Sequence, residues 1–435
     1  MEMCQAGGLK KYLGIEVELR GWAYNFRSSG KIFFLQFRDG TGRVQVVYSA
    51  VDVPAETWET LQRVRIESSV VVRGLVKEEP RSPSGFEIEG HAFEIISLAE
   101  EGYPIGKKEH GPEFLFDNRH LYLRSSVPWA VLRIRDEITW RIQEFLRNEG
   151  FTRTDTPIFQ PTSCEDTTEL YAVDHFGTPA YLTQSGQLYL EAIEHGLGRV
   201  YDFGPVFRAE KSKTRKHLNE FWMMDWEAPL FDQAESEDFT ERMLKYILKN
   251  ILETRQTELK ILERDTTLLA RAAAEPFPRV KLRDMIRILN SEHGFALKPE
   301  DDLNTEAEEK IGEIYKLPVF MEDYPYAVKA FYMHRYTDPD GIERGYCADL
   351  IAPEGAGEIA TAAVRENDYQ KLLQNLEERH YKVTDYQWYL DMRRYGGIPH
   401  AGGGVGLERW VRWITGVSHV RETIPFPRTI NRLTP

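Results

Sequence analysis

The chain has 435 residues, is 42% hydrophobic and 29% charged, and carries a formal net charge of −14. It is long for a single hydrophobic core, so we expect two domains. The acidic balance argues against non-specific nucleic-acid binding by the whole molecule, because phosphate contacts need clustered Lys and Arg, but it is compatible with a local basic face. The sequence has no apolar run of about 18 residues and no apolar signal core at its N-terminus. We therefore expect a cytoplasmic protein without a membrane partner.

The first hundred residues contain five short strand-like segments separated by Gly, Ser and Pro, which predict a small β-barrel. Residues 20–45 carry five Lys or Arg against one acid, and six aromatic residues lie among them: Trp22, Tyr24, Phe26, Phe33, Phe34 and Phe37. This combination is typical of proteins that bind single-stranded nucleic acid, where bases stack on rings. A barrel core built from half of these aromatics would produce the same pattern, so composition alone leaves both interpretations open.

A polar segment, residues 101–124, follows the barrel and predicts a hinge. After it, apolar residues at 131, 134, 138, 142 and 145 have helical spacing, and Gly150 marks the end of that helix. Strands and helices then alternate up to a glycine-rich segment near the C-terminus. We predict an α+β protein with a barrel at 1–100, the hinge, and a second domain at 125–435.

The stretch FRAEKSKTRKHLNEFWMMDWE, residues 207–227, places Arg208 and Glu210 before a cationic loop and Phe221 after it. Such cations suit a polyphosphate, a carboxylate accepts from N–H donors, and a phenylalanine stacks on a purine. A solvated hairpin with a basic tip would have the same composition, and composition alone favours that simpler interpretation.

A second stretch, HAGGGVGLERWVRW at residues 400–413, brings Glu408 and Arg409 to the start of an apolar-periodic helix. Glycines allow a close approach to the backbone, and a helix N-terminus favours anions. The chain has no GxxxxGK phosphate loop, so a nucleotide would have to bind in another way.

Taken together, the helix ending in TDTP, the FRAE hairpin and the GxGxER helix resemble, in chain order, the three signature motifs of class II aminoacyl-tRNA synthetases. The resemblance covers nearly all of the chain and is closest to the asparaginyl members, through these segments: TTEL (167–170), QSGQLYLEA (184–192), HLNEFWM (217–223), APEGAGE (352–358) and IPFPR (424–428). It implies a catalytic domain with an antiparallel sheet flanked by helices. It also implies an OB-fold barrel that reads the anticodon, and a homodimer formed through the first motif, which includes Pro157.

The resemblance implies a role for each residue that matches a family position. Arg208 bridges the amino-acid carboxylate and the α-phosphate of ATP, and the remaining nucleotide contacts come from Glu210, His217, Phe221 and Arg409. Because the carboxylate attacks the α-phosphate directly, positioning and charge neutralisation suffice, and no covalent nucleophile is needed.

Three further groups of residues follow from the same resemblance. Asp349 and Glu358 match the ligands of Mg²⁺, a hard cation that prefers oxygen. The residues expected to hold the α-ammonium and α-carboxylate of the amino acid are Glu165, Ser185 and Gln187. Those expected to hold the central anticodon uridine of a tRNA are Arg27, Phe34 and Gln45.

The resemblance also implies that amino-acid selectivity depends on three positions. Aspartyl enzymes have a lysine after QLY, whereas this chain has Leu190, which favours a neutral side-chain amide over a carboxylate. The acid and the arginine that would contact that amide are Asp225 and Arg365. The expected function is therefore ATP-dependent activation of asparagine and its attachment to tRNA(Asn).

Some positions depart from the family pattern. Asp225 is shorter than the usual glutamate, Trp226 and Asp166 replace a common proline and glycine, and residues 361–364 (TAAV) replace GGSQ. These departures keep an alternative open, a paralogue that adenylates asparagine, aspartate or a related amino acid for another pathway. A non-catalytic RNA-binding relative is disfavoured, because Arg208, Glu358 and Arg409 are all present.

Overall fold

A computed structural model describes residues 1–435 except 83, 107, 165–168 and 212–215. The chain forms two compact units, residues 1–111 and 112–435. The division falls inside the segment predicted as a hinge, and two short helices, α2 (Pro112–Asp117) and α3 (Arg119–Tyr122), begin the second unit. The domain boundaries at residues 100 and 124 stay predictions.

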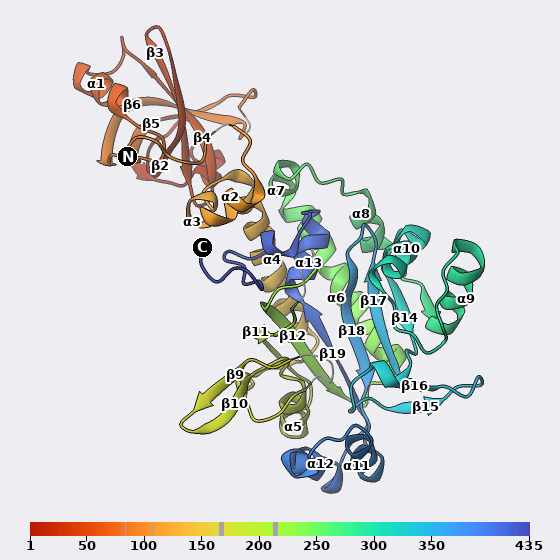
Figure 1. The fold of residues 1–435 in the computed structure, drawn as a ribbon. Helices are drawn as coiled ribbons and strands as arrows, with labels where there is room; N and C mark the ends of the chain where they lie inside the picture. The colour runs from red at the N-terminus through yellow and green to blue at the C-terminus, as the bar shows by residue number, and fades with distance from the viewer. Residues whose placement is uncertain (83, 107, 165–168, 212–215) are drawn as a thin grey trace. The chain divides into compact units, whose positions relative to one another are not determined.

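The first unit is a closed barrel (Figure 1). Its elements are β1 (Glu2–Met3), η1 (Ala6–Tyr12), β2 (Glu16–Ser29), β3 (Ile32–Asp39), β4 (Gly42–Ser49), α1 (Ala55–Arg63), β5 (Ser69–Glu78) and β6 (Phe86–Ser97). Five strands pair in the order β2-β3-β4-β6-β5, and β5 pairs back onto β2, which closes the barrel; β1 adds to β2. All of these five pairings are antiparallel except β4 with β6.

The barrel confirms the expectation of five strands and separates the aromatic residues by face. Phe33 and Phe37 are buried and Phe26 packs against the core, whereas Trp22, Tyr24 and Phe34 stay partly exposed. In β3 successive side chains point to opposite faces, so Phe33 and Phe37 enter the core and Phe34 faces outward. In β2 the register shifts between Ala23 and Asn25, and Phe26 packs against the core although it is two residues from Tyr24.

The second unit is built on an eight-stranded sheet with the order β13-β14-β17-β18-β19-β12-β11-β7. The strands are β7 (Thr152–Arg153), β11 (Val200–Phe207), β12 (Glu220–Pro229), β13 (Arg279–Lys281), β14 (Val319–Glu322), β17 (Cys347–Ala352), β18 (Gly357–Val364) and β19 (His400–Gly406). The six inner strands are antiparallel, and the edge strands β7 and β13 pair in parallel. Seven further strands and helical turns lie outside it: β8 (Phe159–Gln160), β9 (Ala172–His175), β10 (Thr178–Leu182), β15 (Arg335–Thr337), β16 (Glu343–Gly345), η2 (Tyr326–Val328) and η4 (Val420–Glu422).

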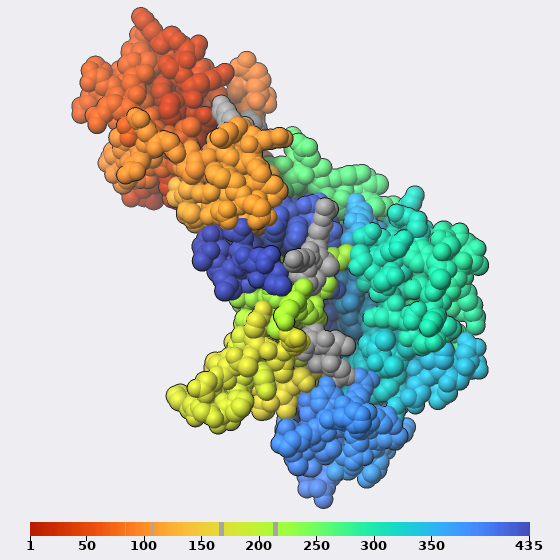
Figure 2. All heavy atoms as spheres, in the orientation of Figure 1, coloured from red at the N-terminus to blue at the C-terminus, as the bar shows by residue number. Residues whose placement is uncertain are grey.

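The second unit also contains eleven further helical segments among its described residues. They are α4 (Ser126–Asn148), α5 (Gln187–Leu197), α6 (Gln233–Thr254), α7 (Gln256–Ile261), α8 (Thr267–Ala274), α9 (Leu282–His293), α10 (Thr305–Tyr315), α11 (Tyr369–Glu378), η3 (Val383–Tyr386), α12 (Gln387–Arg394) and α13 (Leu407–Thr415). The helix predicted from apolar spacing is α4, whose five apolar positions are all buried. Figure 2 shows the β9–β10 hairpin and the α11–α12 segment as lobes that project from the body of this unit.

The main core of the second unit lies between one face of the sheet and the helices α4, α6 and α13. Met224, Trp226 and Ala228 of β12 point into this core. The alternate residues of the same strand, Asp225 and Glu227, therefore belong to the opposite face. Among the described helices, none has the length and apolar character that crossing a bilayer requires.

The barrel leaves no room for a side chain at Gly90. A Cβ there would lie 2.3 Å from Cε1 of the buried Tyr48 ring. We predict that Gly90→Ala destabilises the barrel by about 1–3 kcal/mol, because overpacking forces the ring or the backbone to move. Faster hydrogen–deuterium exchange in peptides from β4 and β6 would measure the loss. Gly40→Ala is the control, since a Cβ at Gly40 meets nothing within 4 Å; equal exchange in the two variants would contradict the prediction.

Candidate active site

A cavity of about 250 Å³ opens on the face of the sheet opposite the helical core. Nine of the residues proposed from the sequence line it: Ser185, Gln187, Arg208, His217, Phe221, Asp225, Glu358, Arg365 and Arg409. Glu210, Leu190 and Asp349 are not among its lining residues. Asp349 lies directly behind Thr361, which does line the cavity. Glu165, and with it Asp166, lies outside the described residues.

The bottom of the cavity is formed by glycines of β19. Gly404 pairs with Asp225 on one side and with Thr361 on the other, and Thr361 pairs in turn with Asp349. A Cβ at Gly404 would lie 2.7 Å from Asp225 Oδ1, and one at Gly402 would lie 1.7 Å from Glu227 Oε1. The glycines are therefore required because carboxylates of the next strand fill the space that a side chain would need.

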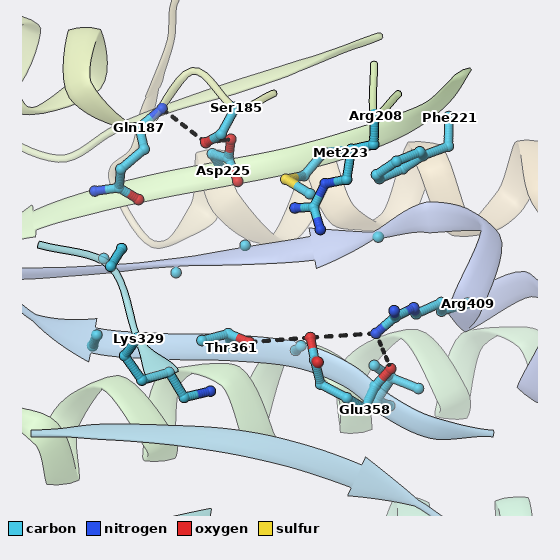
Figure 3. A pocket seen from close by; sticks show the side chains of 18 of the residues that line it. Ser185, Gln187, Arg208, Phe221, Met223, Asp225, Lys329, Glu358, Thr361 and Arg409 are labelled. Carbon is cyan, nitrogen blue, oxygen red and sulfur yellow. Dashed lines mark hydrogen bonds and ion pairs between the residues drawn. The ribbon is translucent and has the colours of Figure 1, made fainter. Parts of the chain in front are cut away.

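Two arginines meet at one end of the cavity (Figure 3). Arg208 follows β11, and its guanidinium carbon lies 5.6 Å from the ring centroid of Phe221. Its Nε is buried and has no hydrogen-bond partner among the described residues. Arg409, in the first turn of α13, donates from Nη1 to the Glu358 backbone oxygen at 2.7 Å. A buried N–H without a partner beside a second guanidinium suits an anionic ligand.

His217 lies near these arginines. Its Nε2 is 3.6 Å from Glu210 Oε2. Burial lowers the pKa of His217, and the neighbouring charges of Arg409 and Arg208 lower it further, although Glu210 opposes the shift. A neutral His217 would have one ring N–H to donate to an oxygen of a ligand.

Two carboxylates lie across β19 from Asp225, Asp349 on β17 and Glu358 on β18, and Glu358 Oε1 is 3.3 Å from Arg409 Nη1. The Thr361 hydroxyl lies 3.0 Å from Asp349 Oδ1 and 3.2 Å from Glu358 Oε1, and it joins the two acids. Lys329 donates to Asp349 Oδ2 at 2.6 Å. Burial raises the pKa of Asp349 to about 6, opposed by Lys329 and reinforced by the charge of Glu358.

Glu358 differs from Asp349 in its electrostatic environment. Burial disfavours its charged form, but Arg409, Lys329 and Arg208 outweigh that cost, so its pKa is lowered. Glu358 also lines the cavity, whereas Asp349 reaches it only through Thr361 and Lys329. The two carboxylates are thus held one hydroxyl apart, and a cation bound beside them would favour the charged form of Asp349.

At the other end of the cavity the segment before α5 is bound to β12. Asp225 Oδ2 accepts from the Ser185 hydroxyl at 2.6 Å and from the backbone N–H of Gly186 at 3.0 Å. The Gln187 backbone N–H in turn donates to Ser185 Oγ at 3.0 Å. Asp225 thus positions both Ser185 and the first turn of α5 beside the cavity (Figure 3).

Arg365 does not bond to Asp225. Its Nη2 donates to Glu227 Oε1 at 2.7 Å and to Gln187 Oε1 at 2.5 Å. Glu227 was not predicted from the sequence, although strand alternation indicates it, because it is two residues from Asp225 and therefore on the same face. Lys329 was not predicted either, and its signal is a single charge within the apolar run PYAVKAFYM.

The departures from the family pattern are distributed over both faces of the sheet. Trp226 is fully buried in the helical core, where its ring centroid lies 4.8 Å from that of Phe239. Ala362 also belongs to that core, whereas Thr361 and Ala363 line the cavity. Only part of the altered segment therefore faces the cavity, where the Thr361 hydroxyl joins Asp349 to Glu358.

Glu191, Glu227 and His400 lie close together, with ligand atoms within 4.8 Å of one another, as in a metal site. Both carboxylates are already paired with guanidiniums, Glu191 with Arg393 and Glu227 with Arg365. The cationic partners of this buried cluster are therefore protein side chains.

The outer surface of the barrel brings the three proposed tRNA contacts together. Arg27 and Phe34 are cross-strand partners, and the guanidinium carbon lies 4.5 Å from the ring centroid. Gln45 pairs with Gln36, two residues from Phe34, and so shares that face. A partly exposed ring beside an arginine can stack a base and contact its backbone.

Each of the two units matches a family model. A model described as tRNA synthetases class II (D, K and N) matches residues 111–430, and one described as OB-fold nucleic acid binding domain matches residues 17–98. The chain belongs to the class II tRNA synthetases. The predicted family and the α+β fold class are thereby confirmed, with the refinement that both edge strands of the synthetase sheet are parallel.

Known asparaginyl enzymes are similar to this chain over nearly its whole length. The asparagine--tRNA ligase of Symbiobacterium thermophilum is 47% identical over 98% of each chain, and that of Pelotomaculum thermopropionicum is 45% identical over all of both. The crystal structure of asparaginyl-tRNA synthetase from Pyrococcus horikoshii complexed with asparaginyl-adenylate has a TM-score of 0.92 and 38% identity, covering 98% of this chain and 97% of that one.

We predict that Phe34→Ala weakens tRNA binding by about 1–3 kcal/mol, because one base loses its stacking partner. Filter binding with tRNA(Asn) transcripts would measure the loss, and tRNA-independent ATP–pyrophosphate exchange should stay unchanged. Ile96→Ala, which shortens another exposed apolar side chain of the barrel, is the control. Equal losses in tRNA binding and in exchange would show that Phe34 has a structural role instead.

Proposed function

We propose that the chain activates asparagine with ATP and attaches it to tRNA(Asn). The observation that carries this proposal is the cavity itself, a glycine-lined space with Arg208 and Arg409 at one end and Glu358 beside Arg409. Asp349 lies directly behind Thr361, which lines the same space. Activation transfers an adenylyl group, so the site must neutralise phosphate charge and align a carboxylate, and the cavity has groups for both tasks. The full-length similarity to asparagine--tRNA ligases supports the same assignment.

In the proposed mechanism Arg208 binds the α-phosphate and the amino-acid carboxylate, whose oxygen then attacks phosphorus as pyrophosphate leaves. The buried, unpartnered Nε of Arg208 supports this role. Arg409 and His217 would contact the outer phosphates, and Phe221, over which Arg208 lies, would stack on the adenine. The proposed contact of Glu210 with the adenine stays a prediction, because Glu210 does not line the cavity.

The donors Asp349 and Glu358 fit a magnesium ion. They are hard oxygen ligands and they are joined by Thr361. Burial, reinforced by the charge of Glu358, raises the pKa of Asp349 against the effect of Lys329, so a cation nearby would stabilise its charged form. We propose that they hold Mg²⁺, which when bound would neutralise phosphate charge. Lys329 keeps Asp349 in place through its 2.6 Å hydrogen bond.

The amino acid would occupy the end of the cavity near α5. Ser185 and Gln187 would hold its backbone groups, and Glu165 stays a prediction for that role. Asp225 and Arg365 would contact the two ends of the carboxamide, one accepting and one donating. Leu190 is fully buried on α5 and does not line the cavity, so its effect would be the absence of a cation near the site.

We further propose a homodimer formed around the first motif. Pro157 is exposed, and its neighbours Ile158 and Phe159 are 43% and 54% exposed, as is Trp140 of α4 at 59%. Large apolar side chains exposed on the helix and the extended segment of the first motif are typical of a subunit interface. The cytoplasmic location stays a prediction.

An ATP–pyrophosphate exchange screen over the twenty amino acids, with and without tRNA, tests the proposed function. Asparagine should be activated far better than aspartate, since a carboxylate in the pocket would meet Asp225 and like charges in contact disfavour joint ionisation. Activation of neither amino acid would contradict the proposed function and favour a paralogue with another substrate.

We predict that Arg208→Ala removes most exchange activity. Losing one preorganised charge contact in a water-excluded site costs about 3 kcal/mol or more, which is roughly a hundredfold in rate. Arg394→Ala, which removes an exposed arginine of α12, is the control and should keep its activity. Near-normal exchange in the Arg208 variant would show that the phosphates bind elsewhere.

A further inference from the structure

Beneath the amino-acid end of the cavity lies a buried charge cluster: Glu191, Glu227, Arg365, Arg393 and His400. Its members come from α5, β12, the end of β18, α12 and β19. Each is at most 7% exposed. Burying five ionisable groups is costly unless each has a partner. Their pairing therefore determines the net charge next to the cavity.

Arg365 is the member that lines the cavity. Its Nη2 and Nε face Glu227, at 2.7 Å from Oε1 and 3.4 Å from Oε2, and Nη2 also donates to Gln187. Its Nη1 makes no hydrogen bond within the described part of the chain, so one edge of the guanidinium is committed to Glu227 and the other keeps a free donor.

Arg393 and His400, the other two nitrogen-bearing side chains of the cluster, contact Glu191. Its carboxylate accepts from Arg393 Nη2 at 2.5 Å, and His400 Nε2 lies 3.1 Å from it. The Tyr389 hydroxyl donates to the same carboxylate at 2.7 Å. Burial disfavours the charged form, but these partners outweigh it and lower the pKa of Glu191. Glu227 is therefore the carboxylate that compensates Arg365.

A third carboxyl, Glu194, lies beside the cluster. No hydrogen-bond donor contacts either of its oxygens within the described residues. Burial, and then the charges of Glu227 and Glu191, raise the pKa of Glu194 to about 9, so it is neutral at pH 7. Burial also raises the pKa of Glu227, opposed by Arg365. Because two N–H groups donate to Glu227 Oε1 and none to Glu194, the negative charge lies on Glu227.

This pairing has a consequence for the ligand. A carboxamide oxygen needs only the free N–H of Arg365, and it brings no net charge into the pocket. A carboxylate would have to compete with Glu227 for a guanidinium that is already neutralised, in a site that also contains Asp225. The pocket therefore disfavours a charged side chain more than Asp225 alone would.

We propose that Glu227 is a selectivity residue of the amino-acid pocket: by neutralising Arg365, it makes that arginine a donor to a neutral carboxamide instead of a counter-ion for a carboxylate. This inference rests on the proposed activation of asparagine. Gln187 supports the pairing, since its side chain accepts from Arg365 and donates to both Glu227 and Glu191.

The test is Glu227→Gln in the full chain, which removes the charge and keeps the shape. The kcat/KM ratio for asparagine over aspartate in pyrophosphate exchange should fall at least about tenfold, mainly through a gain with aspartate, because Arg365 becomes an unpaired cation. The matched control is Glu194→Gln, the same change at the adjacent neutral carboxyl, and its ratio should stay within about twofold of wild type.

A double variant separates charge compensation from structure. Arg365→Met combined with Glu227→Gln removes both charges, and such replacements of buried pairs are often tolerated. The gain with aspartate should disappear in it, because that gain requires the arginine. Glu227→Asp keeps the charge and should retain preference for asparagine even if its KM rises.

Two failures are distinguishable. If wild type prefers asparagine and Glu227→Gln keeps the same ratio, or lowers both activities equally, Glu227 has only a structural role and this inference fails. If Glu227→Gln does not fold, the double variant and Glu227→Asp provide the test. A gain of aspartate activity in the double variant overturns the inference, whereas preference for asparagine in both variants supports it. If wild type activates neither amino acid, the proposed function fails instead.

Discussion

The pairing of β12 with β19 determines the position of nearly every polar group in the cavity. It aligns Asp225, Gly404, Thr361 and Asp349 in one row across four strands. Because neighbouring strands lie about 4.8 Å apart, a glycine in the middle of the row leaves an opening between acids on either side. A shift of one residue in this register would turn Asp225 and Glu227 into the helical core and Trp226 into the cavity.

The second constraint is electrostatic. The cavity lies between two groups of buried charge, with Asp349, Glu358, Lys329 and Arg409 at the nucleotide end and Glu227 with Arg365 at the amino-acid end. Acids and cations are paired within each group, so little net charge is left unsatisfied before ligands bind. Since breaking such a pair costs more than the pair contributes, single charge changes here should alter ligand preference as well as stability.

The alternation of strand side chains explains why some sequence-based expectations were precise and others incomplete. The helical spacing of five apolar positions likewise placed α4, because burial on one face of an element requires a regular period. Strand alternation also shows why Trp226, which looks like an altered pocket residue in the sequence, lies in the core. By contrast, the partner of Arg365 is 138 residues away in the chain, and no periodicity predicts such a contact.

By itself, the sequence determined the class of the fold and the order of the three motifs, because periodicity and motifs are written in neighbouring residues. Its resemblance to class II synthetases pointed to nine residues that line the cavity. Only the tertiary structure decided which acid neutralises Arg365, which hydroxyl joins Asp349 to Glu358, and which of the barrel aromatics face outward. These outcomes depend on pairing between distant strands and on burial, which set the energies of charged groups and which no short segment of sequence specifies.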